Sequence, residues 1–470
     1  MFALHNLSLM EFVDRIKEKE KLEKAILSLP AGLIVLYGRR RVGKSALLKR
    51  VIRKQDIYFQ ADRSEASHQR EVCAKIIAYK IVDFDKVNYP DWEILLTSLN
   101  HRASESFCLC LDEFPYLVEQ SPELPSVLQK LLDEKILKYN LLICGSSQNM
   151  MYGLVFDKKS PLYGRTKEII KLTPLKLPFI EEALDIDGLS AIKEYAVWGG
   201  IPRYWELREA CKSFEEALWH NVFSIDGVLY DEPNQLLRDD MKDTVKASTI
   251  LSFIASGAHR ISEIASRSGE VTTNLSRPIS KLIELGLIEK EIPYGADEKN
   301  SKKTLYKISD QFLAFYFRFV VPNISFVNLD RRKPIEIELQ SGLDEFVGSF
   351  WEKTCREAVT GNEIDGRLYG KAFRWWGTVK TEEGYKQLEL DVVADSIDGK
   401  SILVGECKWT NPEITSVLIK ELKVKISYLP FSKGKKVIPV LFLKNKPKDF
   451  NDLRDTKILY PDDIIALMKQ

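Results

Sequence analysis

The chain has 470 residues, 45% of them hydrophobic, which is enough for several cores, so we expect two to four domains. Its 69 Lys and Arg residues nearly equal its 68 Asp and Glu residues, which excludes a global positive charge as a basis for nucleic-acid binding. Its apolar runs are too short to span a bilayer and its start lacks a signal-peptide pattern, so we expect a cytoplasmic protein without membrane contact.

The first motif is a phosphate-binding loop. An apolar run at 33–37 is followed by Gly38, four residues and then Gly43-Lys44-Ser45, which fits G-x-x-x-x-G-K-[ST] between a strand and a helix. In such a loop the backbone N–H groups hold a polyphosphate, Lys44 reaches the β and γ phosphates, and Ser45 ligates Mg²⁺. The expected nucleotide-binding residues of the loop are Gly38, Arg39, Arg40, Arg41, Val42, Gly43, Lys44, Ser45 and Ala46.

Polar residues end two further apolar runs. Asp112 and Glu113 follow the run at 107–111, where Asp112 can hold Mg²⁺ through water and Glu113 can orient and deprotonate the attacking water. The run at 141–145 leads into Ser146, which can sense the γ-phosphate, although small polar residues also end strands as turn formers.

Five short apolar runs alternate with helical patterns, which predicts an α/β fold with a doubly wound parallel sheet, the class of the P-loop NTPases. The expected strands are 33–37, 57–61, 107–111, 141–145 and 168–172. Cys108 and Cys110 lie within one of these strands without a nearby His, which favours buried thiols over a zinc site.

The order of these motifs resembles that of AAA-like and STAND-like ATPases, in particular the prokaryotic "archaeal ATPase" branch. The segments concerned are "FVDRIKEKEKLEKAI", "YGRRRVGKS", "LDEFPYL", "ICGSS", "SPLYGR" and "WGGIPRY". The resemblance covers about residues 10–240. It implies ATP as the nucleotide, and the chain has no guanine-specific N-K-x-D motif after the sheet.

The resemblance also implies roles for two arginines outside the loop. Arg165 in "SPLYGR" becomes a candidate arginine finger or phosphate sensor, and Arg203 in "WGGIPRY" a candidate second sensor. The residues alone leave other readings open: Arg165 as a surface residue beside a glycine turn, and Arg39–Arg41 as a solvated loop tip. An arginine finger would act between subunits, so a second copy of the chain is a candidate partner.

Three short helical patterns between about 240 and 310 are followed by two β-type segments around a charged loop, which resembles a winged helix-turn-helix. If this segment binds DNA, the third helix would present Asn274, Arg277, Ser280 and Lys281 to the groove. Residues 241–310 hold only 11 basic against 9 acidic side chains. A coupling role between domains is therefore the alternative to DNA contact.

Near the end of the chain, "QLELDVVADSIDGKSILVGECKWT" predicts a β-hairpin with four charged residues among apolar ones. A turn centred on Asp398-Gly399 places Asp391 opposite Glu406 and Glu389 opposite Lys408, with all four on one face. Opposed carboxylates are unfavourable unless a cation neutralises them, so the pattern indicates a divalent-metal site. The alternative is an exposed face with a single Glu389–Lys408 salt bridge.

The hairpin resembles the metal site of the PD-(D/E)xK nuclease fold, and the segment as a whole resembles the DUF234 module that follows this ATPase type. The resemblance implies Asp391, Glu406 and Lys408 as catalytic residues, with Asp391, Glu406 and the helical Glu352 as metal ligands. Leu390 stands where the motif name has Pro.

We therefore expect three domains: an ATPase with a helical lid (1–240), a winged helix with a linker (241–334) and a nuclease-like domain (335–470). The expected function is Mg²⁺-dependent ATP binding and hydrolysis that controls the C-terminal parts, with DNA as a candidate partner. The alternative is a nucleotide-switched interaction protein whose C-terminal domain is not catalytic.

Overall fold

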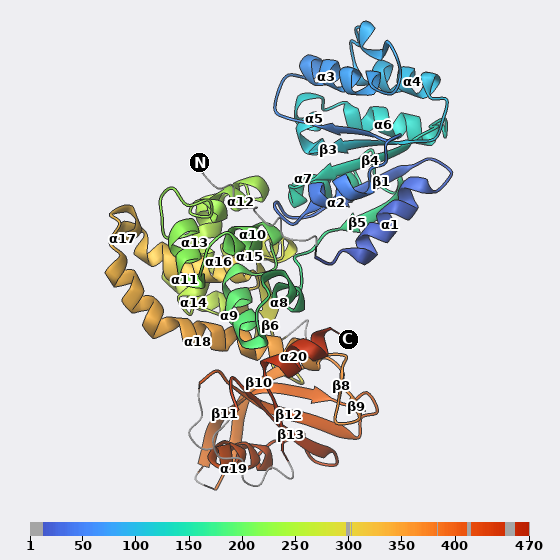
Figure 1. The fold of residues 1–470 in the computed structure, drawn as a ribbon. Helices are drawn as coiled ribbons and strands as arrows, with labels where there is room; N and C mark the ends of the chain where they lie inside the picture. The colour runs from blue at the N-terminus through green and yellow to red at the C-terminus, as the bar shows by residue number, and fades with distance from the viewer. Residues whose placement is uncertain are drawn as a thin grey trace.

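The computed structural model describes residues 13–297, 301, 303–382, 384–410, 415–446 and 456–469. Figure 1 shows three bodies in series: an N-terminal α/β unit, a helical middle and a C-terminal unit built on a second sheet. Over these described ranges, none of the helices has the length and apolar character needed to cross a membrane.

The N-terminal unit is a five-stranded parallel sheet in the order β2-β3-β4-β1-β5. Its strands are β1 Leu33–Tyr37, β2 Ile57–Gln60, β3 Cys108–Asp112, β4 Asn140–Gly145 and β5 Thr166–Lys171. The predicted α/β class and parallel sheet are thus confirmed. Because β4 lies between β1 and β3, the polar residue after β4 lies between the phosphate loop and the acidic pair.

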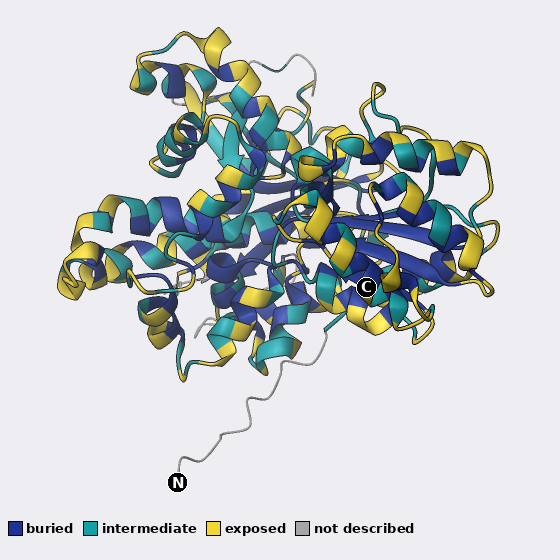
Figure 2. Cartoon of the chain, turned by 90° about the horizontal axis from the view of Figure 1, so that it is seen from above, coloured by how far each residue is buried: buried dark blue, intermediate teal, exposed yellow. Residues whose placement is uncertain are grey.

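Helices cover both faces of this sheet because each strand buries residues of alternate parity on opposite sides. Leu33 and Val35 join one hydrophobic cluster, whereas Ile34 and Leu36 join the other. Figure 2 shows the strands buried between helices whose outer faces are exposed. The helices are α1 Ile16–Leu27, α2 Lys44–Val51, α3 Ala66–Ala78, η1 Phe84–Lys86, α4 Trp92–Arg102, α5 Phe114–Gln120, α6 Leu124–Asp133 and α7 Gln148–Val155.

The helical middle contains two groups of helices. The first group is α8 Pro178–Leu184, α9 Gly188–Trp198, α10 Pro202–Glu209, α11 Phe214–Asn221 and α12 Glu232–Asp240. The second is α13 Thr244–Ala255, α14 Ile261–Ser268 and α15 Thr272–Glu284, followed by the antiparallel strands β6 Ile288–Glu291 and β7 Leu305–Ile308. Three helices followed by a strand pair is the element order expected for this segment, and α15 continues through Pro278.

A long helix leads from the middle into the C-terminal unit. The connecting elements are α16 Gln311–Phe315, η2 Tyr316–Val320, η3 Val321–Asn323, α17 Ile324–Asn328 and α18 Arg332–Val359. The boundary expected at 334/335 falls within the first turn of α18, because the apolar positions of this helix contact both the middle and the second sheet.

The C-terminal sheet has the order β10-β11-β12-β13-β14, antiparallel from β10 to β12 and parallel from β12 to β14. The strands of this sheet are β10 Phe373–Thr381, β11 Gly384–Asp395, β12 Ser401–Lys408, β13 Lys436–Leu443 and β14 Lys457–Leu459. The unit also contains the helices α19 Thr415–Ser427 and α20 Pro461–Met468, and a separate antiparallel pair of β8 Glu363–Ile364 and β9 Arg367–Leu368.

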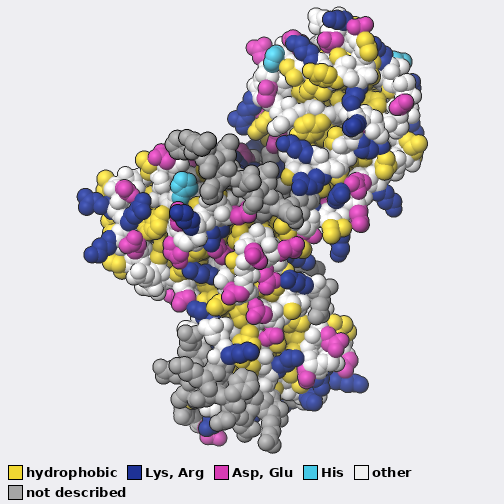
Figure 3. Space-filling view, in the orientation of Figure 1, with side chains coloured by type: hydrophobic (Ala, Val, Ile, Leu, Met, Phe, Trp, Pro, Cys, Tyr) yellow, Lys and Arg dark blue, Asp and Glu magenta, His cyan; other side chains and the backbone are white. Residues whose placement is uncertain are grey.

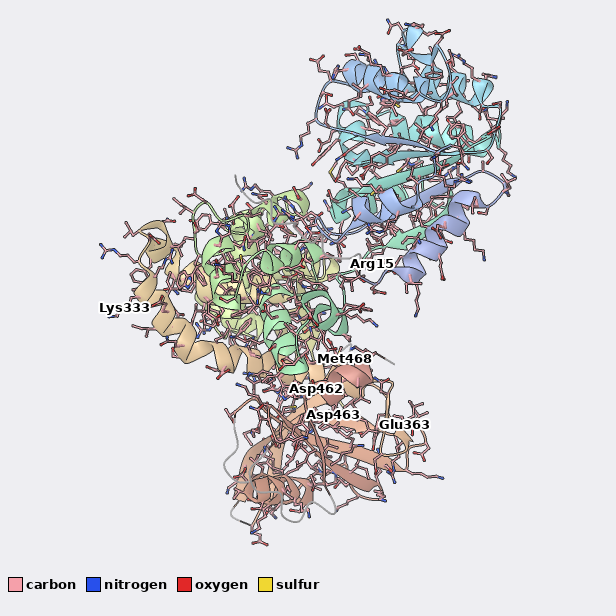
Figure 4. All side chains as sticks on the ribbon, viewed as in Figure 1. Arg15, Lys333, Glu363, Asp462, Asp463 and Met468 are labelled. Carbon is pink, nitrogen blue, oxygen red and sulfur yellow. The ribbon has the colours of Figure 1, made fainter. Side chains whose placement is uncertain are left out.

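The last helix fastens this unit to the middle. Asp462 and Asp463 lie at the start of α20, close to the helical middle (Figure 4). Asp462 Oδ1 accepts the N–H of Gly188 at 3.1 Å, and Asp463 Oδ2 accepts the N–H of Tyr460 at 2.8 Å. A side chain at Gly188 would meet Asp462 Oδ1 at 2.3 Å, so this contact requires glycine.

Candidate functional site

The phosphate loop takes a tight path between β1 and α2 that two glycines make possible. A Cβ on Gly38 would lie 2.3 Å from the carbonyl oxygen of Leu172. Gly43 has φ +98°, a conformation that residues with a side chain rarely adopt. The loop therefore delivers its backbone N–H groups to the start of α2, where the helix dipole favours an anion.

Lys44 and Ser45 begin α2 and lie next to the end of β3. Lys44 Nζ donates to the carbonyl oxygens of Gly38 at 2.9 Å and Arg39 at 3.0 Å, and burial lowers the pKa of this ammonium. Ser45 Oγ donates to Asp112 Oδ2 at 3.1 Å. Among the described residues Lys44 forms no ion pair with a carboxylate, and a buried cation in that position is suited to a polyphosphate.

The acidic pair at the end of β3 is held from both neighbouring strands. Tyr58 on β2 donates its hydroxyl to Asp112 Oδ2 at 2.6 Å. Glu113 has a left-handed backbone, with φ 54° and ψ 42°, and its carboxylate accepts Ser146 Oγ at 2.9 and 3.1 Å. The structure thus brings together the predicted Lys44, Ser45, Asp112, Glu113 and Ser146.

Four of these residues, Lys44, Ser45, Glu113 and Ser146, line a cavity of about 900 Å³, and the buried Asp112 reaches it only through its hydrogen bond with Ser45. Seven basic and three acidic side chains line it, so its charge suits an anion. The basic residues are Arg15, Arg40, Arg41, Lys44, Arg50, Arg63 and Arg203, and the acidic ones are Glu113, Glu206 and Asp239. The predicted loop residues Val42, Gly43, Ser45 and Ala46 also line it.

The three consecutive arginines of the loop are not a solvated tip, because each forms an ion pair with the helical middle. Arg39 is buried and pairs with Asp310, which is also the N-cap of α16. It does not line the cavity. Arg40 pairs with Asp239 at 3.3 Å, and both Arg40 and Arg41 face Glu232, at 3.7 and 3.0 Å.

Glu232 is fully buried and also accepts the hydroxyl of Tyr204 at 3.0 Å. We expect Glu232→Gln to lower the melting temperature measured by scanning calorimetry by about 2 °C, because about 2 kcal/mol is lost when partly exposed guanidiniums lose a buried partner. The matched control is Glu206→Gln, an exposed pair with Arg203 at 2.7 Å, which should shift melting by less than about 0.5 °C. Equal shifts in the two variants would contradict the role assigned to Glu232.

The two arginines implied by the resemblance lie in different surroundings. Arg203 lines the cavity from the start of α10. Arg165 does not line it; its guanidinium forms a bidentate pair with Asp133 of α6 at 2.7 and 2.9 Å, on the surface. Any action of Arg165 on a nucleotide would therefore require a second copy of the chain.

The second predicted site lies where α18 meets β11 and β12. Cys407 N–H donates to Asp391 Oδ2 at 2.8 Å, and Lys425 of α19 donates to both oxygens of Glu406 at 2.8 Å. Burial raises the pKa of Glu352 to about 7, and the nearby charge of Asp391 adds to the rise. Burial and Asp391 raise the pKa of Glu406 as well. The charge of Asp391 therefore acts on both of the other carboxyl groups.

The β11–β12 hairpin has the predicted register, from Val392 with Gly405 to Asp395 with Ile402. No group of three or more His, Cys, Asp or Glu side chains in the described part of the chain is arranged to hold a metal ion. The metal site at the hairpin stays a prediction.

The prediction that the four charged hairpin residues share one face is wrong. β11 shifts its register against β10 at the start of β10, between Phe373 and Trp375. Leu390 and Val392, which would share a face in a regular strand, lie in separate hydrophobic clusters. Glu389 consequently pairs with Arg374 and not with Lys408. Lys408 forms no ion pair with the residues described, although its charge lowers the pKa of Glu406 as a minor contribution.

Sequence reasoning missed four side chains at these sites. Arg15, in the segment before α1 (Figure 4), donates to the carbonyl oxygens of Val42 at 3.3 Å and Thr173 at 2.6 Å. The others are Tyr58, Arg63 and Lys425. Only Arg15 carried a signal, because it belongs to the motif before the loop; the rest reach their sites through long-range packing.

A strand pair that could form a wing is attached to the second sheet. Tyr294, just after β6, donates its N–H to the carbonyl oxygen of Arg374 at 2.9 Å and its hydroxyl to Asp395 Oδ2 at 2.7 Å. Its ring contacts Phe373 and Phe431. On α15, Asn274, Arg277 and Ser280 are exposed, whereas Lys281 is half-buried.

Two family models match the chain. One describes an ATPase domain predominantly from Archaea and matches residues 12–206. The other, DUF234, describes archaeal and bacterial proteins of unknown function and matches residues 316–423.

Curated proteins and solved structures give further matches. An uncharacterized protein of Methanocaldococcus jannaschii is 30% identical over 435 residues, which cover 91% of this chain and 92% of that protein. An uncharacterized ATP-binding protein of the same organism is 48% identical over 46 residues, 10% of this chain and 78% of that protein. The structure of a Walker-type ATPase of Pyrococcus abyssi has a TM-score of 0.50 at 21% identity and covers 65% of this chain and 96% of that one. At this identity the likeness shows the fold.

Proposed function

This chain belongs to the family of predominantly archaeal ATPases that carry a C-terminal DUF234 domain, and from that premise we propose that it binds and hydrolyses ATP with Mg²⁺. The observation that carries this proposal is the convergence of Lys44, the Ser45–Asp112 pair and the Glu113–Ser146 pair at one cationic cavity. A phosphate-holding loop beside a carboxylate base is what phosphoryl transfer to water requires.

The residues at the end of β3 fit Mg²⁺. Ser45 Oγ and Asp112 Oδ2 are hard oxygen donors only 3.1 Å apart, at the edge of the phosphate loop. Mg²⁺ bound there would neutralise charge on the phosphates. Lys44 then binds the β and γ phosphates, Glu113 accepts the proton of the attacking water, and Ser146 holds Glu113 in place and senses the γ-phosphate.

We propose that nucleotide occupancy controls the helical middle through the loop arginines. Arg40 and Arg41 line the cavity and at the same time pair with α12. A triphosphate competes with Glu232 and Asp239 for these guanidiniums, since phosphate and carboxylate use the same bidentate geometry. Bound nucleotide therefore weakens the hold of the loop on α12.

The winged-helix interpretation of residues 241–310 is supported as a coupling element more than as a DNA reader. The segment contacts the loop through Asp310 and the second sheet through Tyr294. Figure 3 shows basic and acidic side chains intermixed over the face in view, without a broad basic surface. Any DNA contact would then be limited to the exposed Asn274, Arg277 and Ser280 on α15.

For the C-terminal unit we propose a nuclease-like site at Asp391, Glu406, Glu352 and Lys408, acting on DNA under control of the ATPase. Carboxylates are the donors that a divalent cation takes, and burial together with the charge of Asp391 raises the pKa of both Glu352 and Glu406, so a cation there would relieve unfavourable negative charge. The three carboxyl groups are not gathered around one point in the described part of the chain, so binding requires them to move closer together. Lys425 must release Glu406 for the cation to bind, so the cation and the Lys425 ammonium compete for one carboxylate.

Calorimetric titration of Mn²⁺ into the full-length chain without nucleotide tests this site. We expect binding in the wild type that Asp391→Ala abolishes and Asp112→Ala leaves intact, because the two carboxylates belong to different units. Mn²⁺-dependent DNA cleavage lost in Asp391→Ala but kept in Lys44→Ala would establish the nuclease.

A second candidate function is a nucleotide-switched interaction protein. It is favoured because Glu406 and Asp391 already have hydrogen-bond partners within the protein, Lys425 and the Cys407 N–H, and so do not need a metal ion. Equal Mn²⁺ heats in the wild type and Asp391→Ala would exclude the hairpin metal site and favour this function. The DUF234 unit would then bind a partner without chemistry.

A further inference from the structure

Arg63 lies in the loop after β2, beside the acidic pair of the ATPase site. In the parallel register of β2 and β3, Gln60 pairs with Asp112, and the next residue, Ala61, donates its N–H to the carbonyl oxygen of Asp112 at 2.9 Å. The backbone that carries Arg63 therefore runs alongside Glu113. Both Arg63 and Glu113 line the 900 Å³ cavity.

The loop that carries Arg63 is well held. Asp62 Oδ1 accepts the N–H of Ser64 at 2.9 Å, and the buried Gln69 donates Nε2 to the carbonyl oxygen of Ser64 at 2.8 Å. The Arg63 guanidinium lies 4.9 Å from the ring centre of Tyr116, in the turn after Glu113. The ring holds the face of the guanidinium and so fixes its orientation, while the N–H groups in the guanidinium plane stay available to donate hydrogen bonds.

Arg63 differs from the other arginines of the cavity in its partners. Arg40 and Arg41 pair with α12, and Arg203 pairs with Glu206. Arg63 forms no ion pair with any residue in the described ranges, and its guanidinium lies over the Tyr116 ring. It is therefore free to bind an anion in the cavity without breaking an existing pair.

We infer that Arg63 binds the terminal phosphate of ATP from within the same chain and stabilises the charge that develops during hydrolysis. The inference rests on the proposed ATPase function. Water attacks the γ-phosphorus, its proton passes to Glu113, the bond between the γ-phosphorus and the β–γ bridging oxygen breaks, and ADP and phosphate leave. The Arg63 guanidinium donates to the γ-phosphate oxygens throughout. This role does not depend on a second subunit, unlike any role of Arg165.

Steady-state kinetics and nucleotide affinities of Arg63→Ala and Arg63→Lys test the inference. We expect Arg63→Ala to lower kcat about 100-fold and to weaken ATP binding about tenfold, while the Kd for ADP changes less than twofold. Arg63→Lys should recover only part of kcat, and added guanidinium should raise kcat of Arg63→Ala. The matched control is Arg332→Ala, another arginine stacked on an aromatic ring, 5.4 Å from the Trp219 ring centre, outside both sites.

The outcomes separate this inference from the proposed function. Wild-type hydrolysis with unchanged kcat and unchanged ATP-to-ADP affinity ratio in Arg63→Ala would overturn the role of Arg63 and leave the ATPase proposal standing. A wild type that binds ATP without hydrolysing it still tests Arg63 through the affinity ratio. A wild type that does not bind ATP would overturn both.

Discussion

Lys44→Ala is expected to raise the Kd for ATP at least 100-fold. The Lys44 ammonium is buried and has a pKa lowered by burial, and its hydrogen bonds within the described part of the chain go to the carbonyl oxygens of Gly38 and Arg39. The positive charge is thus held at an energetic cost that a polyphosphate relieves, so most of its interaction energy appears only when the nucleotide binds. Calorimetric titration with ATP and Mg²⁺ measures the change.

Lys49→Ala is the matched control, since Lys49 lies on the same helix but is exposed. It should bind ATP within about twofold of the wild type, because an exposed charge is largely screened. ATP binding by Lys44→Ala within a factor of three of the wild type would remove the loop as the phosphate site.

Glu113→Gln is expected to bind ATP with near wild-type affinity and to hydrolyse it about 100- to 1,000-fold more slowly. The amide has the shape of the carboxyl group and can keep a hydrogen bond to Ser146, but it cannot take a proton from water. Phosphate release at saturating ATP gives kcat, and a parallel binding titration shows that the site is intact.

The control for this variant is Glu119→Gln, an exposed glutamate on the same short helix segment after β3. Its kcat should equal that of the wild type. Normal turnover in Glu113→Gln would exclude Glu113 as the base, and loss of ATP binding in the same variant would assign Glu113 to binding and not to proton transfer.

The sequence located the ATPase fold well because its signals are local. Each strand of the parallel sheet is a short apolar run, and the polar residues that follow β3 and β4 converge because carboxyl ends of parallel strands share one edge. The sequence alone therefore places Lys44, Ser45, Asp112, Glu113 and Ser146 together.

The misses came from contacts between distant parts of the chain. Arg39 and Asp310 are 271 positions apart, and neither segment carries a sequence signal that predicts their ion pair. Whether a charged loop tip is solvated depends on which body covers it. The same applies to Arg63, because its position beside Glu113 follows from the register of β2 against β3 and not from a sequence motif.

The hairpin shows a different limit. The turn centred on Asp398-Gly399 predicted the mutual register of β11 and β12 correctly, but the faces of β11 also depend on its pairing with β10, where the register shifts. A one-residue irregularity in a neighbouring strand is invisible in the hairpin sequence itself. Because of this irregularity Glu389 forms its ion pair with Arg374 and not with Lys408.

The contacts of Tyr294 with the second sheet bear on how residues 241–310 could bind a DNA duplex. A winged helix that grips DNA with its third helix and its wing together would have to withdraw Tyr294 from Asp395 and from the rings of Phe373 and Phe431. If DNA binding and the Tyr294 contacts exclude each other, the two are thermodynamically linked. DNA bound at the wing would then loosen the C-terminal sheet from the middle, and a ligand that stabilised the Tyr294 contacts would weaken DNA binding by the same factor.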